Sequence, residues 1–284
     1  MNSQYFSAIL FSTLIVLAPA SFGHARFILP SHTILSGDKV QSVSLISSIS
    51  NDIFHPDRAL GDNGKGNVEP QLADLFNMLQ ADVITPDGKT SHSASWQAFA
   101  RMSVADLLIE KSGTYRISLV QPEVHMTTFK DAEGKPSRTF GLMQNIPEGA
   151  TDIVKRASSS RVETFISYNQ PNRASVKPVG KGLGLGGETH PNDLFTGETV
   201  NFQLFFNGKP AGEGVNAHFV LGGTRHRNQR SPIDITTDKD GKFSVEFPEA
   251  GFYIMEAEYA KKGDDNKIDM YHYGLYLTLE VFPQ

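Results

Sequence analysis

Val200–Leu221 (VNFQLFFNGKPAGEGVNAHFVL) is the stretch that decides the fold class. Its first strand-like run alternates apolar with mostly polar side chains, the period of a half-buried β-strand, with Val200, Phe202, Leu204 and Phe206 on one face. Val215–Leu221 repeats the alternation, and Asn207-Gly208 is a dipeptide preferred in tight hairpin turns. The stretch therefore predicts paired antiparallel strands.

The rest of the chain carries the same signals. Pro86-Asp87-Gly88 and Asp240-Gly241 are flanked by strand-like residues and predict further hairpins. The chain has 25 Gly, 15 Pro and 19 Phe, which suits a turn-rich β protein, and helical patterns are weak. We expect an all-β fold.

Two segments late in each half resemble one another: LLIEKSGTYRISLV (Leu107–Val120) and VEFPEAGFYIMEAEY (Val245–Tyr259). Each places a tyrosine, Tyr115 or Tyr253, shortly after a glycine turn and at the start of a strand. This arrangement is typical of the tyrosine corner of immunoglobulin-like sandwiches, in which the phenol bonds back to the preceding loop. Glycine-aromatic pairs also open ordinary strands, so both interpretations stay open.

The chain of 284 residues is long enough for two domains. Phe6–Ala18 is an uncharged run of 13 residues, too short to span a bilayer but suited to a signal peptide, and small residues follow it. We expect a cleaved signal peptide at 1–23, a first β-sandwich at 24–168, a linker at 169–188 and a second β-sandwich at 189–284. No later apolar run is long enough for a membrane span, so the mature protein is expected to be periplasmic, without a span.

Composition narrows the chemistry. The net charge of −5 gives no reason to expect nucleic acid as a partner, and the lack of cysteine excludes thiolate ligands and a cysteine nucleophile. The glycine run Gly182–Gly187 is not followed by a helical pattern, and no G-x-S-x-G elbow occurs. We therefore expect a protein that is not an enzyme, whose metal ligands, if any, are nitrogen and oxygen atoms apart from methionine sulfur.

Without cysteine, histidine is the main candidate for a metal ligand, and the chain has nine. No two of them have the sequence spacing that would place two ligands on one helix or strand. Signal cleavage after Gly23 would make His24 the first residue, where its amino group and imidazole could chelate copper as a histidine brace. Cleavage after Ala20 or Ala25 competes with that outcome.

Strand parity and loop position select the other candidates. His272 lies on the face opposite Leu275, Leu277 and Leu279 and is expected to be reachable by solvent. The basic stretch from Arg225 to Arg230 predicts a loop for an anion or an acidic partner. The predicted metal ligands are His24, His55, Asp57, His190 and His272, and the predicted anion or partner residues are Arg225, His226, Arg227 and Arg230.

Several segments resemble the NikM-like group of Gram-negative periplasmic proteins, often labelled nickel-uptake or cobalt-transport components. They are GHARFILPSHTILSG (Gly23–Gly37), SSISNDIFHPD (Ser47–Asp57), GLGLGGETHPNDLFTGETVNFQLFFNGKPAGEGV (Gly182–Val215) and TTDKDGKFSVEFPEAGFY (Thr236–Tyr253). The resemblance implies an N-terminal β domain and a C-terminal sandwich similar to transthyretin-like or carboxypeptidase-regulatory-like domains. It implies no ligand set.

Together these observations predict two immunoglobulin-like or transthyretin-like β-sandwich domains. We expect the protein to bind a divalent transition metal (Ni, Co, Cu, Zn or Fe), as an ion or a chelate, and to serve a metal uptake or homeostasis system. Its expected partner is an envelope transport component. Metal affinity is expected to fall as pH drops through roughly 6.5, because protons compete for imidazole. One alternative is a metal-free module that docks on an outer-membrane receptor or another envelope partner. Another is a copper oxidase built on a His24 brace.

Overall fold

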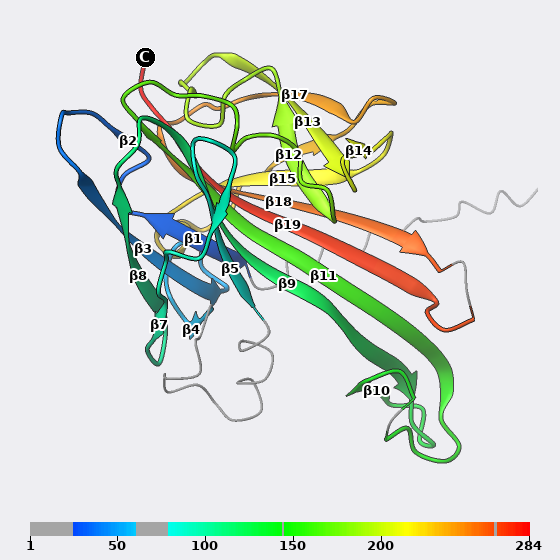
Figure 1. Cartoon of the computed structure of the whole chain (residues 1–284). Coiled ribbons are helices and arrows are strands. Elements are labelled where there is room, and N and C mark those ends of the chain that lie inside the picture. Colours follow the sequence, from blue (N-terminus) through cyan, green and yellow to red (C-terminus); the bar gives the residue numbers. More distant parts are fainter. Residues whose placement is uncertain (1–24, 61–78, 144, 264–265) are drawn as a thin grey trace, which may run out of the picture.

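The computed structural model describes residues 25–60, 79–143, 145–263 and 266–284, which form three β-sheets (Figure 1). In this part of the chain the helical structure is a short 3₁₀ turn, η1 (Thr224–His226), and no helix is long and apolar enough to span a membrane. The predicted all-β sandwich fold is confirmed. The predicted signal peptide, 1–23, and His24 lie outside the described residues.

Sheet A has the order β1-β3-β8-β7, with β4 paired to β3; its strands are β1 (Ala25–Pro30), β3 (Gln41–Ser50), β4 (Arg58–Ala59), β7 (Gln97–Ala98) and β8 (Ser103–Ile109). Sheet C joins β12 (Leu183–Gly187), β13 (Thr199–Phe206), β14 (Lys209–Pro210) and β17 (Lys242–Glu246).

Sheet B lies between them, in the order β16-β15-β18-β19-β11-β9-β5-β6, with β10 on β9 and β2 on β11. Its strands are β2 (Ile34–Leu35), β5 (Gln80–Ile84), β6 (Thr90–Ser91), β9 (Gly113–Lys130), β10 (Pro136–Phe140), β11 (Thr151–Tyr168), β15 (Asn216–Leu221), β16 (Ile233–Thr236), β18 (Gly251–Lys262) and β19 (Met270–Val281).

Sheets A and C cover opposite faces of sheet B. Phe165 of β11 belongs to the core shared with sheet C, whereas its neighbour Ile166 belongs to the core shared with sheet A. Successive side chains of a strand point to opposite faces, so the two cores lie on the two sides of one sheet. The core under sheet A draws on residues 28–168 and the core under sheet C on residues 165–281. Each half of the chain thus contributes most of one core, and a third, smaller cluster joins the halves through Ala25, Phe27, Ile53, Val220 and Ile254.

A parallel pair of strands joins the two halves. β11 of the first half pairs with β19 of the second from Arg156↔Met270 to Thr164↔Thr278. Hydrogen bonds therefore run without a break from the β15–β18 region to the β9–β5 region, and the halves share sheet B (Figure 1).

The sequence signals at Val200–Leu221 hold in the structure. Val200, Phe202 and Leu204 are buried, and Asn207 and Gly208 both have positive φ, as a type I′ hairpin turn requires. The turn at Asp240-Gly241 differs from the predicted hairpin, because β16 before it lies in sheet B and β17 after it lies in sheet C. That turn crosses between the layers.

Both tyrosine corners are present. The Tyr253 hydroxyl donates to the Glu249 carbonyl over 2.9 Å, and the Tyr115 hydroxyl accepts from the Lys111 amide over 2.8 Å. In each case the partner lies four residues upstream, and the phenol ties the strand to the loop that leads into it.

The glycine run has a packing role. The predicted linker, 169–188, includes strand β12, which pairs with β13 from Leu183↔Phe206 to Gly187↔Phe202. A Cβ on Gly187 would lie 2.7 Å from the Phe202 Cα, so only glycine allows β13 to approach this closely. These glycines thus bring two backbones together at the edge of the second core.

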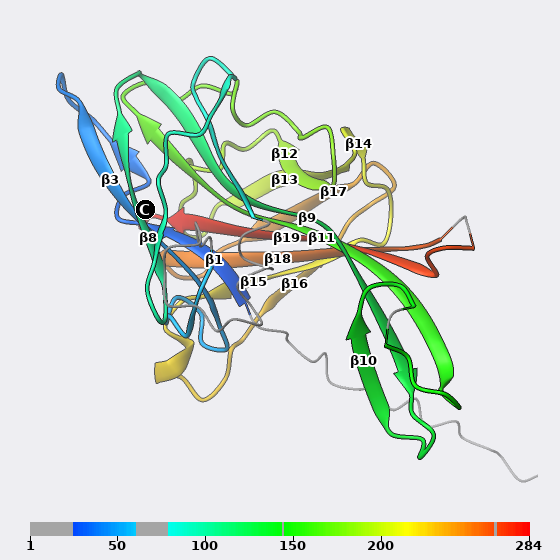
Figure 2. The same cartoon turned by 60° about the horizontal axis from the view of Figure 1, so that its bottom comes forward.

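The long strands of sheet B extend beyond the sheets that cover them. β9 and β11 are 18 residues each and, with β10, form an arm that projects from the body, while the β18–β19 hairpin projects in a different direction (Figure 2). Where the cover of sheet A ends, one face of sheet B is left open, and this face holds the candidate site.

Candidate functional site

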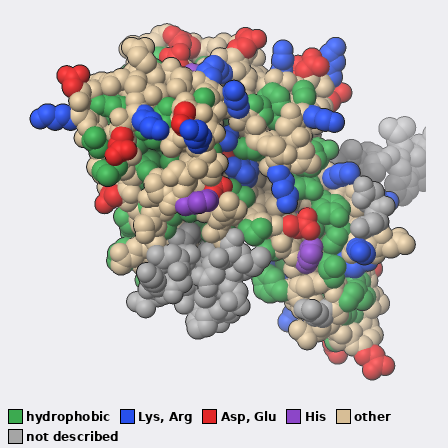
Figure 3. Space-filling model, in the orientation of Figure 1, with side chains coloured by type: hydrophobic (Ala, Val, Ile, Leu, Met, Phe, Trp, Pro, Cys, Tyr) green, Lys and Arg blue, Asp and Glu red, His purple; other side chains and the backbone are tan. Residues whose placement is uncertain are grey.

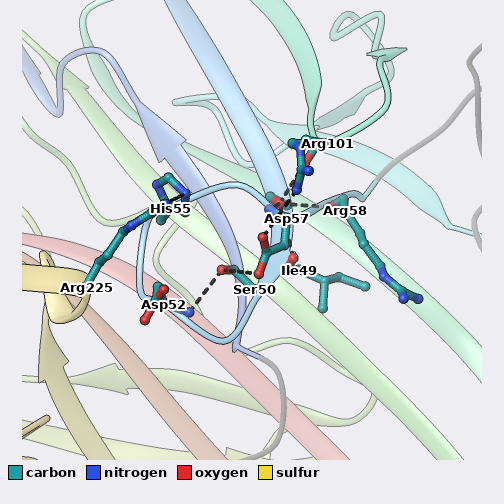
Figure 4. Close-up of polar contacts among 9 residues, drawn as sticks. Ile49, Ser50, Asp52, His55, Asp57, Arg58, Arg101 and Arg225 are labelled. Atoms are coloured by element: carbon teal, nitrogen blue, oxygen red, sulfur yellow. Dashed lines mark hydrogen bonds and ion pairs between the residues drawn. The ribbon is translucent and has the colours of Figure 1, made fainter.

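His55 and Asp57 do not converge on a common point. His55 lies in the turn between β3 and β4, and its Nε2 accepts a hydrogen bond from the Arg225 guanidinium, whereas Asp57 points to the other side of the turn (Figure 4). The Asp57 carboxylate accepts from Ser50 Oγ over 3.2 Å and lies 3.6 Å from Arg101 Nη1. Sequence adjacency placed these two groups together, but their side chains have separate partners.

His190 is tied into the fold by both ring nitrogens. Its Nδ1 accepts from the Asn192 amide over 3.1 Å, so the hydrogen is on Nε2, which lies 3.1 Å from the Asn172 carbonyl oxygen and 3.0 Å from Thr114 Oγ1. Burial lowers the pKa of His190 and keeps the ring neutral. The imidazole thus contacts both Asn172, in the segment before β12, and Thr114, at the start of β9.

The basic loop also binds its own chain. Arg225 contacts His55, Arg230 donates to the Asn51 carbonyl, and Arg227 donates to the Leu221 carbonyl over 2.6 Å. His226 lies at the end of η1. The three arginines thus hold the loop against the body, with Arg225 and Arg230 reaching the turn after β3.

His272 lies in a groove on the open face of sheet B, on the side that strand parity predicted. Its Nε2 accepts from Arg156 Nη1 over 3.0 Å. Partial burial, reinforced by the charge of Arg156, lowers the pKa of His272, while Glu258 acts in the opposite sense. The ring is therefore neutral at pH 7, and its one in-plane lone pair, on Nε2, is engaged by Arg156 and becomes available to a metal only if Arg156 turns away.

The groove has a volume of about 640 Å³, in the size range of small-molecule sites. Its floor follows from strand register, since Ser158 pairs with His272 and Ser160 pairs with Gly274, which has no side chain to fill the space. Strands β9, β11, β18 and β19 supply most of the remaining wall, and the side chains on the face of His272 include Gln121, Glu258 and Tyr276.

Arg26 of β1 stands at one end of this groove. Its Nη1 donates to Gln121 Oε1 over 2.6 Å and to Ser160 Oγ over 2.8 Å, and its guanidinium carbon lies 5.6 Å from the centre of the Tyr276 ring. Arg26, Gln121 and Ser158 also line a second hollow, of about 570 Å³, so the two hollows adjoin. Sequence reasoning missed Arg26, because its partners are 95 and 134 residues away and no local motif marks it.

The predicted ligands do not form a ready cation site in the described part of the chain. His55, His190 and His272 have different hydrogen-bond partners, and within the described residues no three His, Asp or Glu side chains group as a metal ion would need. The geometry gives one accessible neutral imidazole in a polar groove rather than a complete coordination shell.

Comparison with known proteins places the chain in a family. It belongs to the family described as a domain of unknown function (DUF4198), whose model matches residues 21–261. No curated protein matches the chain.

Among solved structures, it is similar to trypsin-activated alpha-2-macroglobulin from Escherichia coli, with 14% identity, 90% of this chain and 16% of that chain covered, and a TM-score of 0.21. The Escherichia coli alpha-2-macroglobulin activated by porcine elastase gives 10% identity, 90% and 31% coverage and the same TM-score. The chain spans less than a third of either protein, and likeness at this TM-score carries no argument about function.

Proposed function

We propose that the protein is a non-enzymatic periplasmic binding protein that takes a divalent transition metal as a preformed chelate into the groove beside His272. The NikM-like resemblance makes nickel and cobalt the first candidates, with copper, zinc and iron after them. The single observation that carries the proposal is the neutral, half-buried His272 imidazole at the floor of a polar groove of about 640 Å³.

Donor number favours a chelate over a bare ion. A protein site for a bare transition-metal ion usually provides three or four donors, and the groove offers His272 with Glu258 near enough to affect its pKa. A chelate brings most of its own donors and needs only one open position filled by the protein. The remaining groove residues can then bind the chelator through hydrogen bonds.

The charged groups around the groove also favour a chelate over a bare ion. Arg156 donates to the His272 ring and Arg26 stands at the end of the groove. These two guanidinium groups stay protonated and offset the two carboxylates that line the groove, Glu213 and Glu258, so a bare dication meets no net negative charge. An anionic chelator satisfies those groups. If Arg156 turns to the chelator, it releases the His272 Nε2 lone pair for the metal.

Equilibrium dialysis with metal quantification tests this function. Purified protein is dialysed against the chlorides of nickel, cobalt, copper, zinc and iron, and against the citrate complexes of the same metals. We expect retention of at least one citrate complex near one equivalent, weaker retention of the chloride, and loss of retention in His272→Ala.

The matched control is His125→Ala, since His125 lies on the arm, outside the groove, next to Glu123 at 3.0 Å. Retention of no metal in any form would refute the function. Equal retention by His272→Ala would refute the site.

A second candidate is a metal-free envelope interaction module, and the arm favours it. Phe140, Met143 and Ile153 are large apolar side chains that are 59%, 60% and 38% exposed on or next to β10 and β11. Apolar surface is visible along the arm at the lower right of Figure 3. Exposed apolar groups that gather on a projecting element are typical of protein contact sites.

Photo-crosslinking in intact cells tests this alternative. A photoreactive residue replaces Phe140 on the arm, and the same residue replaces Leu108 of sheet A, which is 61% exposed, as the control. A discrete adduct to one envelope protein is expected from position 140 and not from position 108. Identical patterns from both positions would count against an interaction role for the arm.

A further inference from the structure

The second hollow has a chemistry of its own. It lies between the end of sheet A and the arm, next to the groove, with a volume of about 570 Å³. We propose that it binds an organic anion with an apolar body, of the class of medium-chain carboxylates, and that Arg58 receives the carboxylate. This site is distinct from the chelate groove and needs no metal.

One wall of the hollow is apolar. Val124 and Met126 of β9 point to the face of sheet B that carries Ser158, and Phe140 of β10 pairs with Met126, so the three lie on one side. Leu60, Leu79 and Ile49 continue this lining. A surface made of six apolar side chains matches a hydrocarbon body better than it matches a hydrated ion, because burial of such a body removes apolar area from water.

The lining also carries positive charge. Three arginines, Arg26, Arg58 and Arg101, line the hollow with one carboxylate, Asp57. Arg101 is 3.6 Å from Asp57, and Arg26 already donates to Gln121 and Ser160. Asp57 offsets the charge of Arg101, so the lining keeps two positive charges, those of Arg26 and Arg58.

Arg58 is the group best placed for an incoming anion. Its backbone is fixed, because β4 pairs with β3 through Ser48↔Ala59 and Ile49↔Arg58, and its carbonyl accepts from Ser48 Oγ over 2.7 Å. Its side chain is exposed, extends away from Asp57 (Figure 4), and has no hydrogen-bond or ion-pair partner among the described residues. A guanidinium on a fixed strand can hold a carboxylate by two parallel hydrogen bonds.

Size and polarity together define the ligand class. A volume of about 570 Å³ accommodates a small organic molecule, and the lining combines a few charged groups with a mainly apolar wall, as in many small-molecule sites. A carboxylate head at Arg58 would direct the apolar tail toward Met126 and Phe140. Decanoate has both parts and is the probe of choice.

Isothermal titration calorimetry of the full chain with decanoate and with decan-1-ol tests the proposal. The alcohol has the same tail and no charge. We expect decanoate to bind at one site more tightly than the alcohol, and Arg58→Gln to weaken decanoate binding by about fivefold, the size expected for a partly exposed charge pair. Arg58→Gln should leave binding of the alcohol unchanged.

Arg138→Gln is the control, because Arg138 is an exposed arginine of β10 that does not line the hollow. A second variant, Val124→Asp, places a negative charge in the apolar wall and should abolish binding of decanoate. Circular dichroism confirms that each variant is folded before titration.

Three results would overturn the proposal: no binding of decanoate at millimolar concentration, equal affinity for decanoate and the alcohol, or equal weakening by Arg58→Gln and Arg138→Gln. The titration contains no metal and leaves His272 intact. Its failure is therefore separate from a failure of the chelate function.

Discussion

Glu163 offers the sharpest test of how the fold is held together. It lies on β11 with its side chain 1% exposed. One carboxylate oxygen accepts from Ser118 Oγ over 2.8 Å and from Arg161 Nε over 2.8 Å, and Arg116 Nε lies 4.0 Å away. Arg116 is itself buried, with its side chain 8% exposed. Glu163, Arg161 and Arg116 thus offset the cost of burying one another's charges.

Glu163→Gln removes the charge and almost none of the volume. The variant removes the main counterion of the buried Arg116 and leaves it only the weaker effect of Asp82, and breaking a buried pair costs about 3–5 kcal/mol. We expect the lower end, about 3 kcal/mol, because Arg161 is partly accessible to water and the glutamine oxygen still accepts from Ser118. Glu246→Gln, an exposed carboxylate of β17, is the matched control and should change stability by less than about 0.5 kcal/mol.

The pH dependence gives an independent check. Burial raises the pKa of Glu163, but the charges of Arg161 and Arg116 outweigh it, and the pKa in the folded protein is lowered. A lowered pKa means that the carboxylate stabilises the fold above its unfolded pKa of about 4.3 and loses this effect as pH falls toward the folded value. The difference between wild type and Glu163→Gln should be full at pH 7.5 and shrink below about pH 4.

Urea unfolding followed by far-ultraviolet circular dichroism measures both quantities. A difference below about 1 kcal/mol at pH 7.5 would refute the reasoning, since it would mean that Arg116 finds other compensation. A difference that stays constant from pH 7.5 down to pH 3 would refute the electrostatic origin.

Four further predictions follow from other parts of the structure. Tyr253→Phe removes the hydroxyl that donates to Glu249 and should cost about 0.5–1.5 kcal/mol in the same urea assay, whereas no loss would mean that the corner is not a stabilising contact. Phe202→Ala empties a fully buried position of the second core and should cost about 3–5 kcal/mol, and a much smaller cost would indicate that this core is loosely packed. If the chelate binds His272, retention should persist as pH falls through 6.5 and decline only below it, because the pKa of His272 is lowered; dialysis at a series of pH values checks this, and loss centred above 6.5 contradicts it. Mass spectrometry of exported protein should give a mature N-terminus after Ala20, Gly23 or Ala25, and any first residue other than His24 eliminates the histidine brace.

Local patterns predicted the local structure well. The alternation at Val200–Leu221, the Asn207-Gly208 turn and the parity of His272 each depend on residues a few positions apart, and the structure has all three. The tyrosine corners at Tyr115 and Tyr253 also belong to this group, since each phenol bonds to a residue four positions upstream. Short-range periodicity is a direct consequence of strand geometry.

Long-range pairings could not be predicted from these patterns. β11 and β19 pair although their partner residues are 114 positions apart in the sequence, and the sequence of neither strand identifies the other as its neighbour. The groove depends on that pairing, because it sets Ser158 beside His272. Glu163 resembles any solvent-facing charge in the sequence, and only the packing of sheet C over its face makes it a buried group. The prediction of a hairpin at Asp240-Gly241 was wrong for the same reason, since the strands on either side of this turn belong to different sheets.

The position of β19 has a consequence for how the chain is made. This strand, residues 270–281, follows all the other described strands along the chain, yet it lies between β18 and β11 in the middle of sheet B. A ribosome, which builds the chain from the N-terminus, produces this central strand after the other described strands of sheet B. Until then β11 lacks its partner from Arg156 to Thr164, and an early stop codon exposes an unpaired strand edge in the first half as well as the second. Truncations that remove β19 should therefore aggregate rather than leave a sound N-terminal half.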